Sequence, residues 1–471
     1  MPFKLFIFTF FISALIFKAH AGVHQYQVTI DENIENANVE ICFDGKAPEY
    51  LAIANKSGNQ DLVLFPQSKQ GPIEIQGRYW KTKKLSKNAC LSYQVNIKRH
   101  HAKRSKQSAD RKNIAFIEEN TWLWLPELIN QKYDVQLSFK LPLWAEISAP
   151  WLQPDLSKYE YRLGSQPQEW GYTLLIGDFN RQVSQIDQGH HLDIASARHL
   201  EKRQPIIQWL TDVGKGLNNY LGDYPAKRTQ IIVIAKQQKA NRGPVPWSYL
   251  TRGNGFGIRF VVVPSYDIED FYSDWNATHE FSHQLLPKIR YDDIWLSEGL
   301  SSYLQFVLLS QSGKISQEKA WLKIHKGFQR GEKGTKKLKN ETLSASSRKR
   351  KSKGRSGRTM RIYWSGALYF LKADVALREA SGGKQGLNDV LLKLNRCCIE
   401  GSKVWVGEEL ASKLDELSGV AVFRQLYQEF SNATHFPEYQ STFEQLGVSF
   451  ASDEKQPVQI KENSLAKIIM Q

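Results

Sequence analysis

The hydrophobic pattern of this chain changes once, near residue 198, and that change limits the folds available to it more than any other feature. Between residues 22 and 197, apolar and polar residues alternate in short segments such as HQYQVTI and YDVQLSFKL. A period of two, with β-branched and aromatic side chains, is typical of strands that bury one face. We therefore expect one antiparallel β domain, a sandwich or a saddle-like sheet, over residues 22–197.

After residue 198, apolar residues recur every three to four positions, which is the period of an amphipathic helix. Two strand-like segments, TQIIVIAKQ and GIRFVVVP, follow the first of these helices. The other expected helices span residues 268–286, 295–312, 316–329, 362–380, 387–396, 408–417 and 421–430. The expected fold class is α+β, with the β domain first, a mixed and helical region over residues 198–330, and a C-terminal helical part over residues 361–471.

The formal net charge of +15 is confined to two segments of the chain. Residues 98–112 hold seven Lys or Arg and one Asp, and residues 333–361 hold twelve and one Glu. The rest of the chain is nearly neutral, so we expect no specific nucleic-acid partner. Segments so rich in Lys, Arg, Gly and Ser cannot build a core. We expect mobile surface loops at 98–112 and 331–360, the second dispensable for folding. The alternative is docking to an anionic membrane or polymer surface.

The N-terminus has the pattern of a signal peptide over residues 1–21. Residues 5–17 form an apolar run that is too short to span a membrane, and Ala19-His20-Ala21 provides small residues for cleavage. We therefore expect an exported, periplasmic or secreted protein, with an uncleaved N-terminal anchor as the alternative.

An oxidising compartment makes a disulfide between Cys42 and Cys90 plausible. Two unpaired buried thiols remain the alternative. Cys397 and Cys398 are adjacent and lack the CxxC or CxxH spacing of metal sites, so they are poor candidates for metal ligands.

The segment HEFSH contains two histidines, His279 and His283, four positions apart on an expected helix. Their imidazole rings then project from one face and can bind the same Zn²⁺ ion. Glu280 lies beside that ion without being a ligand, in the position of a general base.

A second motif, WLSEGLSSY, begins at Trp295 and places Glu298 at the start of another expected helix. The turn between the two helices can return Glu298 to the metal as a third protein ligand. Two histidines and one glutamate leave a fourth position for water, which is typical of a catalytic zinc site. We therefore expect one zinc ion per chain, held by His279, His283 and Glu298.

Together these two motifs resemble the gluzincin metallopeptidases, which include the aminopeptidase N and glycyl aminopeptidase families. The segment RIYWSGAL, from Arg361, resembles the Y-x-K-G-A helix start of both families, and SGGKQGLNDVLL is most similar to the glycyl aminopeptidase branch. The resemblance covers roughly residues 200–450. It implies a thermolysin-like zinc peptidase domain after the β domain, with Glu280 as general base and Tyr363 as hydrogen-bond donor to the oxyanion.

The chain departs from this family pattern at three places. Ser365 stands where the families have lysine, and the interval from His283 to Glu298 is shorter by about one helical turn. The families also carry a glutamate that holds the substrate's free amine, on a strand upstream of HExxH.

In this chain, the strand upstream of HExxH reads GFGIRF, with Gly255, Gly257 and Arg259 as the expected substrate-binding residues. Arg259 would then replace the amine-binding glutamate, which predicts an enzyme that is not a strict aminopeptidase. If the register differs and Arg259 faces solvent, an acid from elsewhere, such as Glu269, could bind the amine.

We therefore expect an exported zinc metallopeptidase acting on peptides or proteins, with the choice between exo- and endopeptidase open. The alternative is a zinc-bound but weakly active or inactive relative that binds peptides or an anionic surface. The presence of Glu280 argues against an inactive relative, since a decayed site has no need of its base.

Overall fold

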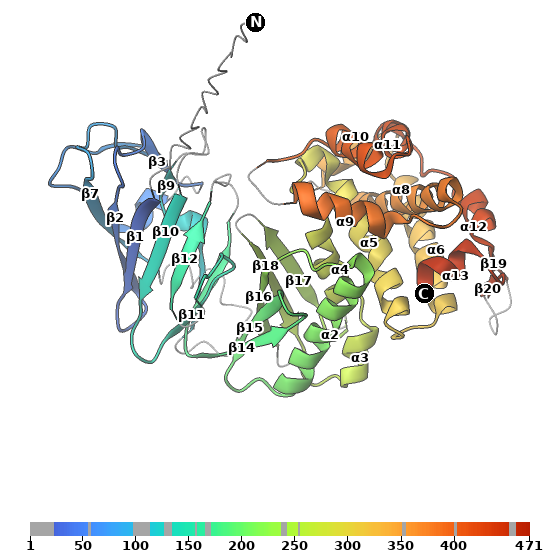
Figure 1. The fold of residues 1–471 in the computed structure, drawn as a ribbon, viewed down its shortest axis with the longest axis horizontal. Helices are drawn as coiled ribbons and strands as arrows, with labels where there is room; N and C mark the ends of the chain where they lie inside the picture. The colour runs from blue at the N-terminus through green and yellow to red at the C-terminus, as the bar shows by residue number, and fades with distance from the viewer. Residues whose placement is uncertain are drawn as a thin grey trace, which may run out of the picture.

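The computed structural model describes residues 23–54, 58–97, 114–126, 134–155, 158–164, 171–236, 243–252, 255–350, 355–399, 403–451 and 458–471. Its architecture is the expected α+β class: a β domain, a mixed sheet in the middle and a helical region follow one another along the molecule (Figure 1). The signal-peptide expectation and the basic segment 98–112 lie outside the described residues. Within the described part, no helix is long and apolar enough to cross a membrane.

The β domain consists of three sheets, with strand orders β12-β10-β1-β2-β7-β4, β5-β6-β3-β9 and β11-β13-β8. Pairing is antiparallel except between β1 and β10, which run parallel. The strands are β1 (Val23–Ile30), β2 (Asn36–Cys42), β3 (Tyr50–Ala52), β4 (Leu62–Gln67), β5 (Glu74–Gln76), β6 (Tyr79–Lys81), β7 (Cys90–Asn96), β8 (Ile114–Glu118), β9 (Leu125–Pro126), β10 (Asp134–Lys140), β11 (Glu146–Ser148), β12 (Glu160–Leu163) and β13 (Thr173–Gly177).

Aromatic side chains fill the core of the β domain. Trp80 and Trp124 are fully buried and stack with their ring centroids 4.0 Å apart. Cys42 and Cys90 are paired across β2 and β7 and form a disulfide, so the alternative of two free thiols is wrong. Cys397 and Cys398 are also bonded to each other.

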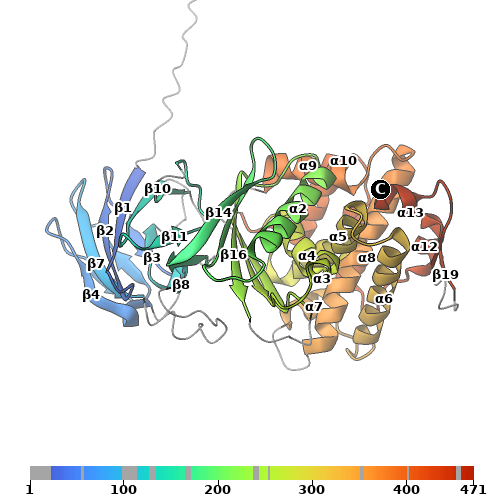
Figure 2. The same ribbon diagram turned by 90° about the horizontal axis from the view of Figure 1, so that it is seen from below.

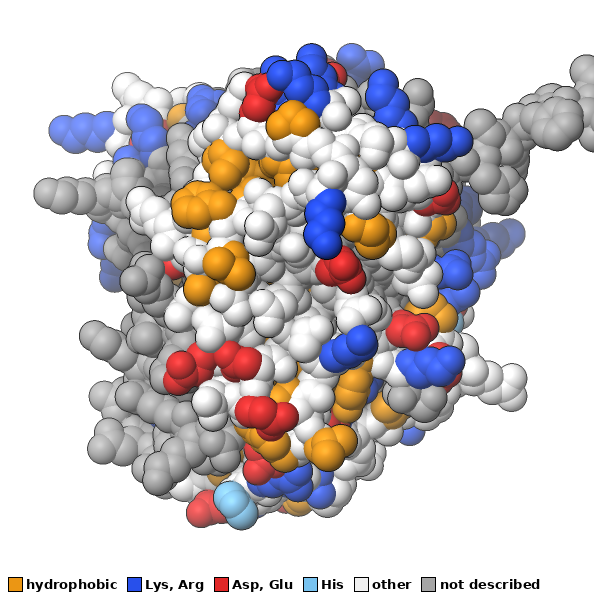
Figure 3. Space-filling model, turned by 90° about the vertical axis from the view of Figure 1, so that its left-hand side faces the viewer, with side chains coloured by type: hydrophobic (Ala, Val, Ile, Leu, Met, Phe, Trp, Pro, Cys, Tyr) orange, Lys and Arg blue, Asp and Glu red, His pale blue; other side chains and the backbone are white. Residues whose placement is uncertain are grey.

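Figure 3 looks onto the β-domain end of the molecule, where the visible positive and negative side chains are interspersed. The edge strand β4 exposes three apolar side chains, Val63, Leu64 and Phe65. The described side chains of this face therefore form no field of one charge, and they do not by themselves favour docking to an anionic surface.

A buried carboxyl group in the β domain should make the stability of the protein depend on pH. Glu119 is 3% exposed, and burial raises its pKa to about 8. Between the pKa of an unfolded glutamate, about 4.3, and this raised value, the folded state binds more protons than the unfolded state. The free energy of unfolding contributed by Glu119 therefore falls as the pH rises through this window.

We expect the free energy of unfolding of Glu119→Gln to depend less on pH than that of the wild type. At pH 8 it should be higher than the wild-type value by about 1 kcal/mol or more, since one pKa unit corresponds to about 1.4 kcal/mol. Chemical denaturation at pH 5 and pH 8 measures the difference, with the exposed Glu40→Gln as the control. Parallel pH profiles for wild type and Glu119→Gln would contradict the expectation.

The middle of the molecule is a five-stranded sheet with the order β14-β15-β16-β18-β17. β15, β16 and β18 are parallel, and the edge strands β14 and β17 are antiparallel to their neighbours. The strands are β14 (Phe179–Gln185), β15 (His191–Ala197), β16 (Arg228–Ala235), β17 (Trp247–Arg252) and β18 (Phe256–Val262). Because β15 pairs with β16, the domain boundary expected at residue 197 falls inside this sheet, which begins at Phe179.

This sheet connects the two halves of the molecule. One face packs against β8 and β13 through a small apolar cluster that includes Leu175, Ile232 and Val261. The helices lie on the other side of this sheet (Figure 2). α2 and α4 contact its strands, and most of the other helices extend away from it. The helices are α2 (Arg203–Leu221), α3 (Ile268–Ser273), α4 (Asn276–Ser282), α5 (Ile294–Gln311), α6 (Gln317–Thr335), α7 (Leu343–Arg348), α8 (Arg355–Ser381), α9 (Leu387–Cys398), α10 (Gly407–Ser418), α11 (Phe423–Asn432), α12 (Gln440–Leu446) and α13 (Leu465–Met470), with a short hairpin of β19 (Val448–Phe450) and β20 (Val458–Ile460).

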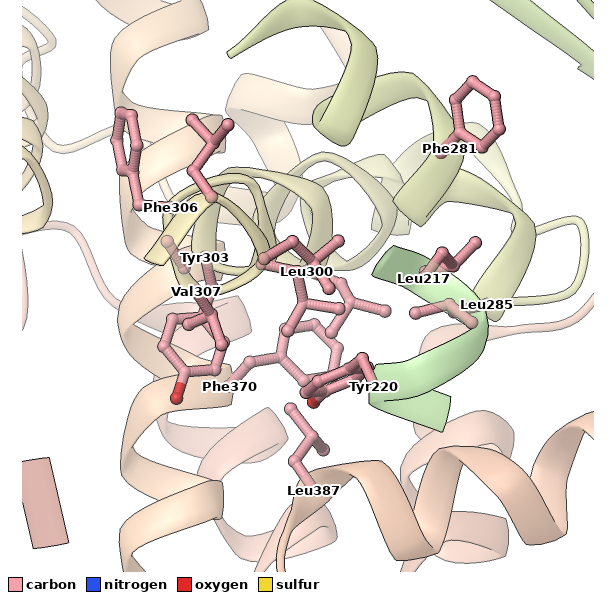
Figure 4. Packing of buried hydrophobic residues seen from close by; sticks show 14 of the residues in the cluster. Leu217, Tyr220, Phe281, Leu285, Leu300, Tyr303, Phe306, Val307, Phe370 and Leu387 are labelled. Atoms are coloured by element: carbon pink, nitrogen blue, oxygen red, sulfur yellow. The ribbon is translucent and has the colours of Figure 1, made fainter. Parts of the chain in front are cut away.

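The helices share one large core. In Figure 4, Leu217 and Tyr220 of α2 lie near Leu300 of α5 and Leu387 of α9, and Phe370 of α8 joins them. This core fixes α4, α5 and α8 relative to one another, and these three helices carry the residues that the sequence singled out for catalysis.

The single helix expected over residues 268–286 is divided in the structure. α3 ends at Ser273 and α4 begins at Asn276 because Asp274 accepts hydrogen bonds from the backbone N–H and the side chain of Asn276. A side chain that satisfies the first N–H groups in this way starts a new helix.

The expectation of a mobile basic loop over residues 331–360 is wrong for most of that segment. It contains the end of α6, all of α7 and the start of α8, and residues 351–354 lie outside the described part. Several of its described cations have partners: Arg358 makes a two-pronged ion pair with Glu341, and the buried Arg361 donates to the carbonyl groups of Glu341 and Ala433. Basic composition alone did not distinguish paired cations from solvated ones.

Candidate metal centre

The structure brings together the three residues expected to hold a metal. His279 lies on α4, His283 begins the short 3-10 helix His283–Leu285, and Glu298 lies in the second turn of α5. One ligand atom from each residue lies within 4.8 Å of the other two. Oε2 of Glu298 is 3.4 Å from Nε2 of His279 and 3.7 Å from Nε2 of His283.

Both imidazole rings are oriented by side chains of α5. Nδ1 of His279 is 3.0 Å from Oε1 of Gln305, and Nδ1 of His283 is 3.0 Å from Oγ of Ser297. With Nδ1 of each ring engaged in this way, Nε2 faces the carboxylate of Glu298. Zinc-binding histidines characteristically hydrogen-bond through their other nitrogen, so this donor set fits a Zn²⁺ ion.

The charge states of Glu298 and His283 suit a metal, whereas the carboxylates of Glu298 and Glu280 raise the pKa of His279 in spite of its burial. Burial favours the neutral form of Glu298, but its hydrogen bond with His279 and the charges around it hold its pKa well below the usual range. Burial lowers the pKa of His283 far below its usual value. A carboxylate and a neutral imidazole are the forms that bind a metal ion.

The connection between α4 and α5 is held by a residue that the sequence analysis did not identify. Arg252, at the end of β17, donates hydrogen bonds to the backbone carbonyl groups of His283, Leu286 and Pro287 at 2.7–2.9 Å. These carbonyl groups lie at and beyond the C-terminal end of α4, where they have no hydrogen-bond partner within the helix. Arg252 thereby fixes the end of the segment that carries His283.

Two glycines allow α5 and α8 to approach closely beside the centre. A Cβ atom on Gly299 would lie 2.3 Å from the backbone of Gly366, and one on Gly366 would lie 2.1 Å from the carbonyl oxygen of Trp295. No larger residue fits at either position. This close packing explains the glycines of the SEG and SGA motifs, and it brings Tyr363 of α8 to Glu298 of α5.

Tyr363 lies directly over the metal ligands. Its ring is stacked on that of His279, with centroids 5.7 Å apart and planes 9° apart. Its hydroxyl group accepts a hydrogen bond from Nη2 of Arg350 at 3.1 Å and is also hydrogen-bonded to Glu298. Burial raises the pKa of Tyr363 well above its usual value, so the phenol keeps its proton and can donate it in a hydrogen bond.

Glu280 is held by the edge strand β17. Its Oε1 accepts a hydrogen bond from Oγ of Ser248 at 3.0 Å, and the backbone N–H of Leu250 also donates to its carboxylate. Burial raises the pKa of Glu280 to about 7. The carboxylate of Glu280 is therefore fixed beside the residues expected to hold a metal.

The structure does not bring Gly255, Gly257 and Arg259 to this centre. Both glycines pack against Pro150 of the β domain, and the guanidinium group of Arg259 lies 4.5 Å from the centroid of the Trp247 ring. They belong to β18 or to its start, and β18 is hydrogen-bonded on both sides, by β16 and β17. The strand beside Glu280 is β17, one strand earlier in the chain than the sequence analysis expected.

No family model matches the sequence, and no curated protein matches it. The structure does resemble solved structures. An aminopeptidase N family protein from Idiomarina loihiensis superposes with a TM-score of 0.66 at 16% identity, over 94% of this chain and 82% of that chain.

Two structures of an M1 zinc metallopeptidase from Deinococcus radiodurans are also similar. One superposes with a TM-score of 0.54 at 13% identity, over 89% of this chain and 94% of that chain. The other is a mutant bound to a Tyr-Ser-Ala substrate, with a TM-score of 0.53 at 13% identity, over 89% and 96% of the two chains. This chain therefore has the two-domain α+β fold of the M1 zinc metallopeptidases.

Proposed function

We propose that this protein is a zinc-dependent metallopeptidase that hydrolyses peptide bonds. The observation that carries the proposal is the convergence of His279, His283 and Glu298, with Glu280 and Tyr363 beside them. The peptide-bound structure of the similar Deinococcus radiodurans enzyme supports a peptide as the class of substrate.

A bound Zn²⁺ ion at these ligands would act as a Lewis acid and lower the pKa of a water molecule. Glu280 accepts a proton from the attacking water and passes it to the leaving nitrogen. The oxygen of that water adds to the carbonyl carbon and the C–N bond breaks, and the second proton of the water also passes to the nitrogen, which yields a carboxylate and an ammonium group. The hydroxyl group of Tyr363 donates a hydrogen bond to the former carbonyl oxygen of the peptide bond, which becomes negatively charged when water adds.

The edge strand β17 offers a surface for the substrate backbone. Among the strands that the structure describes, β17 is paired with β18 on one side and with none on the other. An extended peptide can add to such an edge through main-chain hydrogen bonds. Exposed Trp247 and Tyr249 stack on each other along this strand, while Ser248 between them faces Glu280.

Incubation of the zinc-loaded protein with a mixture of peptides, followed by mass spectrometry of the products, tests this function. We expect new termini inside or at the ends of the peptides, and we expect these products to disappear when a chelator removes the metal. Intact peptides after prolonged incubation would favour the second candidate, a zinc-bound protein that binds peptides without cleaving them.

Export and docking to an anionic surface are further proposals. Both rest on the N-terminal segment or the basic segments, which lie at least partly outside the described residues.

We expect little discrimination between free and blocked N-termini. The strand beside Glu280 contains no Asp or Glu over residues 247–252, and Glu269, the other acid considered, is exposed in the first turn of α3. A carboxylate that binds an ammonium group contributes about 1.5–3 kcal/mol, and that contribution should be missing.

A matched pair of peptides, one with a free and one with an acetylated N-terminus, measures this recognition. We expect kcat/KM values within about tenfold of each other, which is within about 1.4 kcal/mol. A preference above about 100-fold for the free amine, about 2.7 kcal/mol, would show that an amine site exists.

A further inference from the structure

We propose that Arg350 is a positioning residue of the metal centre, which holds Glu298 and Tyr363 in their working orientations. Its guanidinium group lies between α5 and α8. Nη1 donates to Oε1 of Glu298 at 2.7 Å, and Nη2 donates to the hydroxyl oxygen of Tyr363 at 3.1 Å. One side chain thus contacts both an expected metal ligand and the expected oxyanion donor.

Arg350 differs from its basic neighbours in the same run. The side chain of Arg350 is 22% exposed, whereas those of Arg348 and Lys349 are 54% and 58% exposed. Arg348 pairs with Asp292 and Lys349 with Glu341, at 3.3 and 3.5 Å. Exposed pairs of this kind contribute little, whereas a half-buried pair at 2.7 Å is a strong, charge-assisted contact.

The chain holds Arg350 in place through the short helix α7. Thr342 caps this helix by accepting a hydrogen bond from the backbone N–H of Ala345. Leu343 and Ser346 of this helix are buried, and the backbone N–H of Arg350 donates to the carbonyl group of Ser347. Arg350 is therefore directed to the centre by a packed segment.

Because of the contact with Arg350, the two carboxylate oxygens of Glu298 have different partners. Oε1 is engaged by Arg350, and Oε2 faces Nε2 of both His279 and His283. A carboxylate that is held by a guanidinium group at one oxygen offers the other oxygen to a metal without rotating. Groups that orient metal ligands in this way typically raise metal affinity by 10–100-fold.

The contact with Tyr363 directs the proton of the hydroxyl group. Because the oxygen accepts from Arg350, the hydroxyl proton must point elsewhere, to Glu298 or to a substrate oxygen. The stacking of the ring on His279 fixes the side chain, and Arg350 fixes the hydroxyl group. Loss of Arg350 should therefore reduce turnover more than it weakens substrate binding.

The test compares Arg350→Gln and Arg350→Lys with Arg348→Gln, which removes one positive charge from an exposed site two residues away. For Arg350→Gln we expect zinc affinity to fall by about 10–100-fold, measured by competition with a chromogenic chelator. We also expect kcat to fall by about 10–100-fold with KM nearly unchanged. Arg350→Lys retains the positive charge but cannot contact Glu298 and Tyr363 with two separate nitrogens. Its zinc affinity and kcat should therefore lie between those of Arg350→Gln and Arg348→Gln.

A readout on the metal-free protein separates this inference from the proposed function, on which the zinc and turnover readouts rest. Arg350→Gln leaves the buried carboxylate of Glu298 without its cation, so the melting temperature should fall by several degrees. Adding Glu298→Gln should recover most of that loss. The role of Arg350 would be overturned if Glu298→Gln did not recover the melting temperature of Arg350→Gln. It would also be overturned if Arg350→Gln had the same zinc affinity and kcat as Arg348→Gln. If the coupling is present but the wild type neither binds zinc nor cleaves peptides, the proposed function is wrong and the contact stands.

Discussion

The His283→Ala protein is expected to fold and to hold no zinc after a desalting column. The substitution leaves His279 and Glu298 as ligands, and two ligands do not retain zinc against buffer. Activity should fall below detection, because the group that polarises the substrate is lost. His279→Ala and Glu298→Ala should behave alike, since each removes one member of the same cluster. Elemental analysis of the purified variants measures the bound zinc.

An exposed histidine provides the matched control for these variants. His199 lies outside the cluster and is exposed, so His199→Ala should retain the zinc of the wild type. Circular dichroism checks that each variant is folded. Full zinc occupancy in a folded His283→Ala protein would remove this residue from the metal centre.

The Glu280→Gln protein is expected to keep its zinc and to lose turnover by about 10²–10⁴-fold, which is the usual contribution of a general base. The glutamine oxygen can still accept the hydrogen bond from Ser248, so the local structure should be preserved. The amide cannot take a proton from water, so the chemical step fails while binding of the metal and of the substrate continues.

Steady-state kinetics on one peptide, together with zinc analysis of the same sample, measures this effect. Glu269→Gln is the matched control, because it makes the same change at an exposed position of α3. Turnover in Glu280→Gln equal to that of this control would exclude Glu280 as the base.

The cluster of His279, His283 and Glu298 could be predicted from the sequence because the spacing of the two histidines is a local property of a helix. Two histidines four positions apart share a helix face wherever the helix lies. Glu298 needed only the short turn before α5. The position of Tyr363 depended on a family resemblance, and the structure adds the physical reason, which is the contact between Gly299 and Gly366.

The position of the strand beside Glu280 could not be predicted in the same way. β17 reads WSYLTR, and its polar and exposed residues lack the buried pattern of a central strand. The glycines of GFGIRF match the family's motif instead, so the resemblance points to β18 and to Gly255, Gly257 and Arg259 as substrate-binding residues. Strand order in a sheet is a long-range property that alternation of residues does not encode.

The roles of Arg350 and Arg252 could not be predicted from the sequence for a related reason. A run of Lys and Arg has the same appearance whether its members point to solvent or to a buried carboxylate. Arg348 and Lys349 precede Arg350 and are exposed, and among these three cations Arg350 is the one that contacts Glu298. Arg252 contacts residues more than thirty positions away, and Arg350 contacts Glu298 and Tyr363, which are 52 and 13 positions away, so no local pattern marks them.

The proposed function requires that peptide hydrolysis by this chain depend on bound zinc. The most direct measurement is a titration of metal-free protein with zinc, followed by elemental analysis and by the rate of cleavage of one peptide. We expect the rate to rise linearly and to reach its plateau at about one zinc per chain, the stoichiometry of a site with two histidines and one glutamate. A rate that is unaffected by removal of the metal, or a chain that binds one zinc and cleaves no peptide, would contradict the proposed function.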